Sequence, residues 1–177
     1  RDIKNIFVGI SKKFLFLCFL RGISFVLMQI FYYISIINMN FATATTLTFS
    51  SPIFIVVLSM LVLKEKIGLF RWSAIFIGFG GVLSIMNPTS DLFSYISILP
   101  LLAALCWAIS NIVLKFIPED ISSVEINFYS INFSYIGSLI ILLFSSDFSP
   151  VENSFDWLLL ILIGILGGVA SILFSFA

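Results

Sequence analysis

The chain contains no histidine and only two cysteines among its 177 residues. Without histidine, His-dependent nucleophilic catalysis and bis-histidine haem ligation lose their central group. Cys18 and Cys106 both lie inside apolar runs, so we interpret them as packing residues rather than as a disulfide framework or a metal site. The sequence therefore favours a protein that is not an enzyme and that uses no cofactor and no metal.

Charge is also scarce, because only 10% of the residues are charged whereas 60% are hydrophobic and 21 are Phe. A soluble fold of this length needs far more polar residues to cover its surface. The nine basic and nine acidic residues cancel, so the charge gives no sign of a nucleic-acid partner. These values predict an integral membrane protein in contact with lipid.

Long apolar runs indicate an all-α, polytopic transmembrane helix bundle. A helix needs about 20 predominantly apolar residues to cross the hydrocarbon. Short polar segments separate the runs. We predict six spans, at 14–39, 41–63, 70–86, 93–115, 122–145 and 157–177.

Basic residues outside the spans occur only on alternate sides of the predicted membrane. Because basic loops stay in the cytoplasm, this distribution places the N-terminal segment there. The basic loops carry Arg1, Lys4, Lys12 and Lys13, then Lys64, Lys66 and Arg71, then Lys115.

Pro52 lies inside the second predicted span. Proline removes the backbone hydrogen bond to the Thr48 carbonyl and crowds that turn, so we expect a kink. Thr45, Thr48, Ser50 and Ser51 surround it. Two interpretations are open: their hydroxyls satisfy the freed backbone groups, or they line a wet cavity that binds a solute.

Arg21 is the one basic residue clearly inside a span. Its guanidinium either extends to the cytoplasmic headgroups or pairs inside the bundle at a functional site. Gln29 and Tyr32 fall near the same helix face, since spacings of eight and three approximate whole turns. Trp107 and Asn111 form a similar pair on the fourth span, where either contacts a ligand or Asn111 hydrogen-bonds another helix.

Pairs of small residues at i and i+4 predict places where helices touch. They are Ala74 with Gly78, Ala104 with Ala108, and Gly164 with Gly168.

Glu65 follows the second span, where the helix dipole disfavours an anion. Lys64, Lys66 and Arg71 are close in sequence, so we interpret Glu65 as a structural staple of the cytoplasmic hairpin rather than as a proton carrier.

Residues 31–88 resemble the EamA-type branch of the drug/metabolite transporter superfamily. The elements that carry the resemblance are a Thr-rich helix entry, Ser51-Pro52, Glu65, Arg71-Trp72, and Gly78 with Gly80-Gly81-Val82. The resemblance implies ten helices in two five-helix repeats of inverted topology around a central cavity. The six spans would then be helices three to eight, with residues 1–88 ending the first repeat and 92–177 starting the second.

The resemblance also implies a secondary transporter, in a bacterial inner membrane, that moves a small organic metabolite or drug by alternating access. Nucleotide-like metabolites such as S-adenosylmethionine are one substrate class, and a second copy of the chain is a candidate partner. A membrane scaffold or assembly subunit is the alternative; a membrane transferase would have only Glu119, Asp120 and Glu125 as its acidic cluster. The candidate substrate-binding residues are Arg21, Gln29, Tyr32, Thr45, Thr48, Ser51, Trp107 and Asn111, with Pro52 and Glu65 in gating or structural roles.

The chain is also expected to be a piece of this longer protein. An offset of 142 residues aligns Gly22-Ile23 with Gly164-Ile165, as in a weak internal repeat. The same offset predicts a further Thr- and Ser-rich apolar helix with a proline near position ~194.

The alternating basic loops predict the topology. Single cysteines at Ser90 and Asn153, in a cysteine-free background, should react with an impermeant thiol reagent added outside the cell. A cysteine at Lys66 should be protected until the membrane is permeabilised. External labelling of the Lys66 position would reverse the predicted orientation.

Overall fold

Helices account for almost all of the structure. The computed structural model describes residues 11–86, 95–118, 120–144 and 153–176, and this part contains no strand. The prediction of an all-α polytopic bundle is confirmed. The helices are α1 (Lys12–Asn38), α2 (Phe41–Thr48), α3 (Ser51–Val62), α4 (Leu69–Met86), the short 3₁₀ helix η3 (Tyr95–Ser97), α5 (Ile98–Leu114), α6 (Ser123–Phe144) and α7 (Ser154–Phe176).

Each of the six predicted spans corresponds to an apolar helix or helix pair. Four segments in the described part are long and apolar enough to cross a membrane: Lys12–Asn38, Phe41–Val62, Tyr95–Leu114 and Ser123–Phe144. The second segment comprises α2 and α3 together, and the third comprises η3 and α5. Leu69–Ser84 of α4 and Ser154–Ala170 of α7 are shorter apolar helices.

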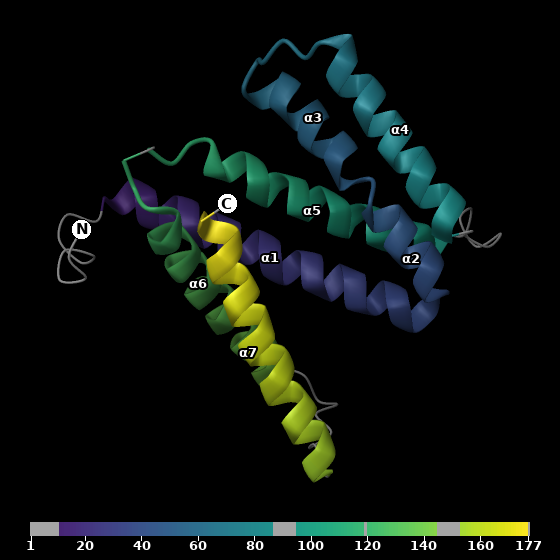
Figure 1. Cartoon of the computed structure of the whole chain (residues 1–177). Coiled ribbons are helices and arrows are strands. Elements are labelled where there is room, and N and C mark those ends of the chain that lie inside the picture. Colours follow the sequence, from purple (N-terminus) through teal and green to yellow (C-terminus); the bar gives the residue numbers. More distant parts are fainter. Residues whose placement is uncertain (1–10, 87–94, 119, 145–152, 177) are drawn as a thin grey trace.

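Helix α1 lies at the centre of the bundle, between α5 and α6 (Figure 1). Helix α5 also packs against α2 and α3, whereas α7 contacts α6 and α4 contacts α2. Ala104 and Ala108 on α5 are fully buried, which confirms the predicted contact at this small-residue pair. Cys18 and Cys106 are also buried and unpaired, as expected of packing residues.

Gly22 and Gly137 mark a close approach between α1 and α6. A Cβ atom at Gly22 of α1 would lie 2.7 Å from Cβ of Phe133 and 2.9 Å from the carbonyl oxygen of Ser130, both on α6. At Gly137 of α6 it would lie 3.1 Å from a methyl group of Val26. The two glycines therefore allow α1 and α6 to cross with their backbones almost in contact.

The other predicted small-residue contacts are wrong for the described structure. A Cβ atom at Gly78, Gly164 or Gly168 would meet no atom within 4 Å, and Ala74 is exposed. Lipid and protein are equally apolar surroundings, so small-residue spacing alone does not distinguish a helix contact from an exposed face.

The second span is broken at the predicted place. Helix α2 ends at Thr48 and α3 begins at Ser51, with Pro52 in the first turn of α3, where its missing N–H costs nothing. Ser50 bridges the break, because its N–H and its hydroxyl both donate to the Leu47 carbonyl oxygen, at 3.1 and 2.6 Å. The predicted kink is thus confirmed as a full interruption of the helix.

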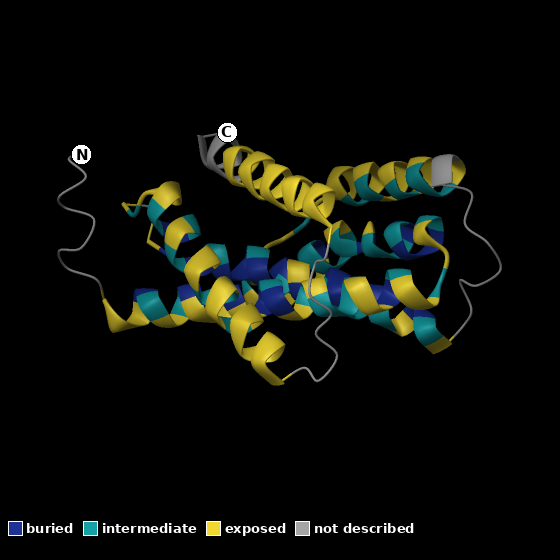
Figure 2. Ribbon diagram, turned by 90° about the horizontal axis from the view of Figure 1, so that it is seen from below, coloured by how far each residue is buried: buried dark blue, intermediate teal, exposed yellow. Residues whose placement is uncertain are grey.

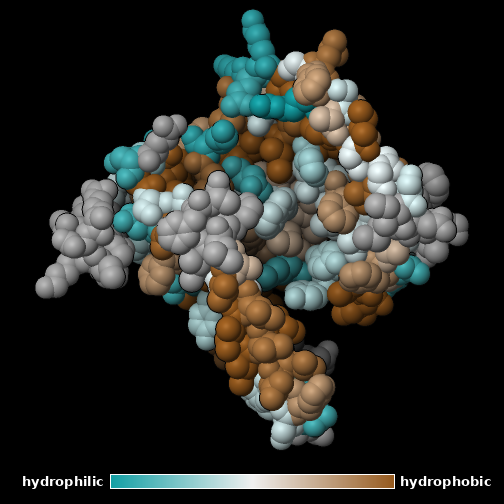
Figure 3. All heavy atoms as spheres, viewed as in Figure 1, coloured by the Kyte–Doolittle hydropathy of each residue, from teal (hydrophilic) through white to brown (hydrophobic). Residues whose placement is uncertain are grey.

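Apolar side chains cover much of the outer surface. In Figure 2, α7 is exposed along its described length, and every described side chain from Asn153 to Ala170 is exposed. Figure 3 shows the same helix as a continuous hydrophobic surface. An apolar exterior around buried polar groups is the arrangement that a bilayer requires.

Glu65, in the loop after α3, pairs with Arg71 in the first turn of α4. Its carboxylate lies 4.0 Å from the guanidinium of Arg71, and the side chains of Glu65 and Arg71 are 42% and 64% exposed. Exposed pairs of this kind contribute only about 0–1 kcal/mol. The expected pairing is present, but it is a weaker staple than the sequence suggested, and α4 packs against α2 rather than along α3.

Substituting Gly22 tests the close crossing of α1 and α6. Gly22→Ala places a methyl group against the Ser130 carbonyl and forces the helices apart, so we expect a loss of about 1–3 kcal/mol. Thermal unfolding of the purified protein in detergent measures this loss. Gly78→Ala is the control, since nothing surrounds that position; equal melting temperatures for the two variants would contradict the close crossing.

Candidate functional site

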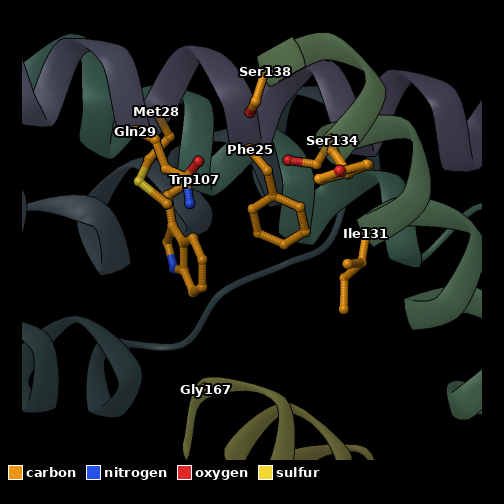
Figure 4. Close-up of a pocket in the computed structure, with 9 residues that line it drawn as sticks. Phe25, Met28, Gln29, Trp107, Ile131, Ser134, Ser138 and Gly167 are labelled. Atoms are coloured by element: carbon orange, nitrogen blue, oxygen red, sulfur yellow. The ribbon is translucent and has the colours of Figure 1, made fainter. Parts of the chain in front are cut away.

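The larger of two neighbouring pockets is lined by residues of α1, α5, α6 and α7 (Figure 4). Its volume is about 580 Å³. Figure 4 shows Phe25 and Trp107 side by side, with Ile131 and Ser134 across from them and Gly167 on the far side. The lining residues are Phe25, Met28, Gln29, Trp107, Ile131, Ser134, Tyr135, Ser138 and Gly167.

The smaller pocket lies at the break in the second span. Its volume is about 350 Å³, and it shares Met28 and Trp107 with the larger pocket. The two pockets are therefore neighbours, with the side chains of Met28 and Trp107 lining both. The residues that line the smaller pocket are Met28, Tyr32, Thr45, Thr48, Phe49, Ser51 and Trp107.

An aromatic pair forms the wall between α1 and α5. The rings of Phe25 and Trp107 have centroids 5.6 Å apart and planes tilted by 55°. Trp107 is 37% exposed although it sits in the middle of α5, so part of its face is open to the pockets. A partly open indole face is a surface on which a planar ring can stack.

Hydroxyl groups supply the polar side of the smaller pocket. The Thr45 hydroxyl donates to the Phe41 carbonyl oxygen at 2.7 Å, so it accepts the 3.3 Å hydrogen bond from the Tyr32 hydroxyl. The Thr48 hydroxyl likewise donates to its own helix, at the Ala44 carbonyl oxygen. These hydroxyls donate to carbonyl oxygens inside α2, and their oxygens keep lone pairs that can accept a hydrogen bond in the pocket.

The structure brings most of the predicted site residues together. Gln29 lines the larger pocket, Tyr32, Thr45, Thr48 and Ser51 line the smaller one, and Trp107 lines both. Asn111 lines neither pocket, and its amide nitrogen donates to the Trp107 carbonyl oxygen of its own helix at 2.8 Å. The expected hydrogen bond from this nitrogen to another helix is therefore wrong.

Sequence reasoning missed several lining residues. Phe25 and Met28 are apolar, so nothing in their type distinguishes them from lipid-facing side chains. Ser134 and Ser138 carried a usable signal, because two hydroxyls at i and i+4 inside a span mark a polar face.

Arg21 is buried between α1 and α6, with only 7% of its surface exposed. Its Nη1 donates to Oδ1 of Asn127 at 2.8 Å and to Oγ of Ser130 at 3.2 Å. Its guanidinium carbon also lies 5.0 Å from the centroid of the Phe25 ring. The interpretation that Arg21 extends to the headgroups is thus wrong, and Arg21 is not among the residues that line either pocket.

Acidic residues form no cluster near these pockets. Among the described residues, no group of three or more His, Cys, Asp or Glu side chains is placed to hold a metal ion. Asp120 is exposed and Glu125 is half-buried at the start of α6, whereas Glu119 lies outside the described residues. The side chains that line the pockets can bind a ligand by stacking on aromatic rings and by hydrogen bonds to hydroxyl groups.

Relatives of the chain carry the names of transporters. The riboflavin transporter of Rhizobium johnstonii is 39% identical over 72 residues, which is 41% of this chain and 24% of that protein. The riboflavin transporter of Vibrio cholerae is 33% identical over 70% of this chain and 41% of its own length. The S-adenosylmethionine uptake transporter of Rickettsia conorii is 28% identical over 72% of this chain and 42% of its own length. The chain thus spans less than half the length of these relatives.

Family membership follows from matches over nearly the whole sequence. No solved structure matches the chain significantly. The model of the EamA-like transporter family matches residues 3–87 and again residues 94–177. Together with the apolar helices and the pocket at the broken span, these two matches identify the chain as a member of the EamA-like transporter family.

Proposed function

We propose that the whole protein is a secondary transporter that moves a small organic metabolite across a bacterial inner membrane by alternating access. The observation that carries this proposal is the smaller pocket at the break of the second span, with the larger pocket next to it beyond Met28 and Trp107. Broken helices that line a cavity are a recurring feature of transporter binding sites. The names of the bacterial relatives support the same activity.

The lining residues favour a substrate with a planar ring and a polar chain. The ring stacks on Trp107 beside Phe25, and the chain reaches the hydroxyls of Tyr32, Thr45 and Ser51. Riboflavin and S-adenosylmethionine, which two of the relatives are named for, both combine a ring system with a polar chain. This deepens the expectation of a nucleotide-like metabolite.

In this proposal the break at Pro52 is the moving element. Phe49 and Ser50 connect two short helices, and Pro52 has no backbone N–H to donate across the connection. Changes of backbone angle at such a break open and close a cavity without unfolding the helices on either side. Glu65 lies outside both pockets and keeps its proposed structural role.

Uptake by the full-length protein in reconstituted vesicles separates a transporter from a membrane scaffold. With radiolabelled riboflavin and S-adenosylmethionine among the test solutes, we expect uptake that saturates. Trp107→Ala removes the stacking surface, and we expect its KM to rise about tenfold. Trp72→Ala is the matched control, since Trp72 lines neither pocket. A wild-type protein that moves no solute would support the scaffold function. Equal changes of KM in the two variants would exclude the pocket as the substrate-binding site.

Restoring a continuous helix at the break should slow transport. Pro52→Ala returns a backbone N–H to the first turn of α3, which favours joining of α2 and α3. We expect a turnover rate several-fold lower with little change in KM or melting temperature, because gating affects rate more than stability. Pro118→Ala, beyond the end of α5, is the control. A normal turnover rate in Pro52→Ala would leave the break without a role in gating.

A further inference from the structure

Arg21 carries a charge that no carboxylate neutralises in the described structure. Its two hydrogen-bond acceptors, Asn127 and Ser130, are neutral. Its Nε atom is buried and has no hydrogen-bond partner among the residues that the structure describes. The only ion pair among the described residues joins Glu65 and Arg71, far along the chain. An isolated guanidinium inside a membrane protein is costly, which makes a purely structural role insufficient to explain it.

Two features connect this charge to the larger pocket. The Phe25 ring, whose face lies 5.0 Å from the guanidinium carbon, is part of the pocket wall. On α6, the acceptors of Arg21 continue into a polar stripe at spacings of three, four and four residues, along one helix face. The stripe consists of Asn127, Ser130, Ser134 and Ser138, of which the last two line the pocket.

At the end of the stripe that lines the pocket, Ser134 and Ser138 carry hydroxyl groups. Ser134 is half-buried and Ser138 is exposed, and neither bonds to another group within the described ranges. Along α6, the hydroxyls of Ser134 and Ser138 are therefore about one and about two helical turns from Ser130, which Arg21 contacts, and both can donate to a ligand. In surroundings of low polarity a charge acts over such distances with little screening.

We propose that the α1 and α6 side of the larger pocket binds the anionic group of the transported solute, a carboxylate or a phosphate, between Ser134 and Ser138. Arg21 selects this group through its uncompensated charge and does not contact it. The proposal rests on the proposed function, and it assigns the charge of the substrate and the end of the pocket where that charge lies.

The electrostatic part can be measured without any knowledge of the substrate. The full-length protein, with Cys18 and Cys106 replaced by Ala, receives one cysteine at Ser138. Its reaction rates with anionic sulfonatoethyl and cationic trimethylammonioethyl methanethiosulfonate give a ratio that reports the local potential. We expect the anionic reagent to be favoured. Since this ratio does not depend on transport, its failure is distinguishable from failure of the proposed function.

Asn127→Asp is the decisive variant. It keeps the shape of Asn127 and keeps Arg21, but it places a carboxylate on the guanidinium and neutralises the charge. We expect the ratio at position 138 to fall at least about tenfold. Arg21→Gln should do the same, whereas Arg21→Lys should preserve the ratio to within about threefold.

A cysteine at Ser73, on the exposed face of α4, is the control position. The ratio of the two reaction rates at this position should be the same with and without Asn127→Asp, because the charge change at Arg21 is local and does not reach α4. An unchanged ratio at position 138 in Asn127→Asp, or a cysteine there that reacts with neither reagent, would overturn the proposal.

Discussion

A bilayer offers no hydrogen-bond partner to the groups inside it, and this constraint shapes the whole bundle. Hydroxyl side chains within the spans donate back to their own helices, as Ser24 does to Leu20 and Ser35 does to Phe31. Arg21 is the most demanding case, because its guanidinium cannot be satisfied by its own helix. Its bonds to Asn127 and Ser130 join α1 to α6, at the place where Gly22 lets the two backbones approach.

The same constraint explains why the smaller pocket lies at the broken span. An interrupted helix leaves polar groups that lipid cannot satisfy, so the break must face protein or a cavity. Here it faces α1 and α5, and the hydroxyls of Thr45 and Thr48 that stabilise the backbone also line the smaller pocket. In the proposed function, hydroxyls that already bond within α2 also offer hydrogen-bond acceptors to a solute.

Sequence patterns predicted the local structure better than the contacts between helices. The helix ends, the break at Pro52 and the hydroxyl-bearing residues of the smaller pocket followed from apolar runs, proline chemistry and polar faces. The small-residue spacing predicted a helix contact at Gly164, but that glycine is exposed. The spacing did not identify Gly22, which lies at the close crossing of α1 and α6. Helix surfaces that face lipid and those that face protein are alike in composition, so only the three-dimensional arrangement separates them. For Arg21 the deciding acceptors lie on α6, more than 100 residues away.

The central claim is that the transported solute binds in the two neighbouring pockets that Trp107 lines. A cryo-electron microscopy map of the full-length protein, prepared with a solute that it transports, tests this claim most directly. The account predicts ligand density against Trp107, with its polar groups near the hydroxyls of the smaller pocket or the serines of α6. Ligand density elsewhere, with side chains filling the space beside Trp107, would contradict it.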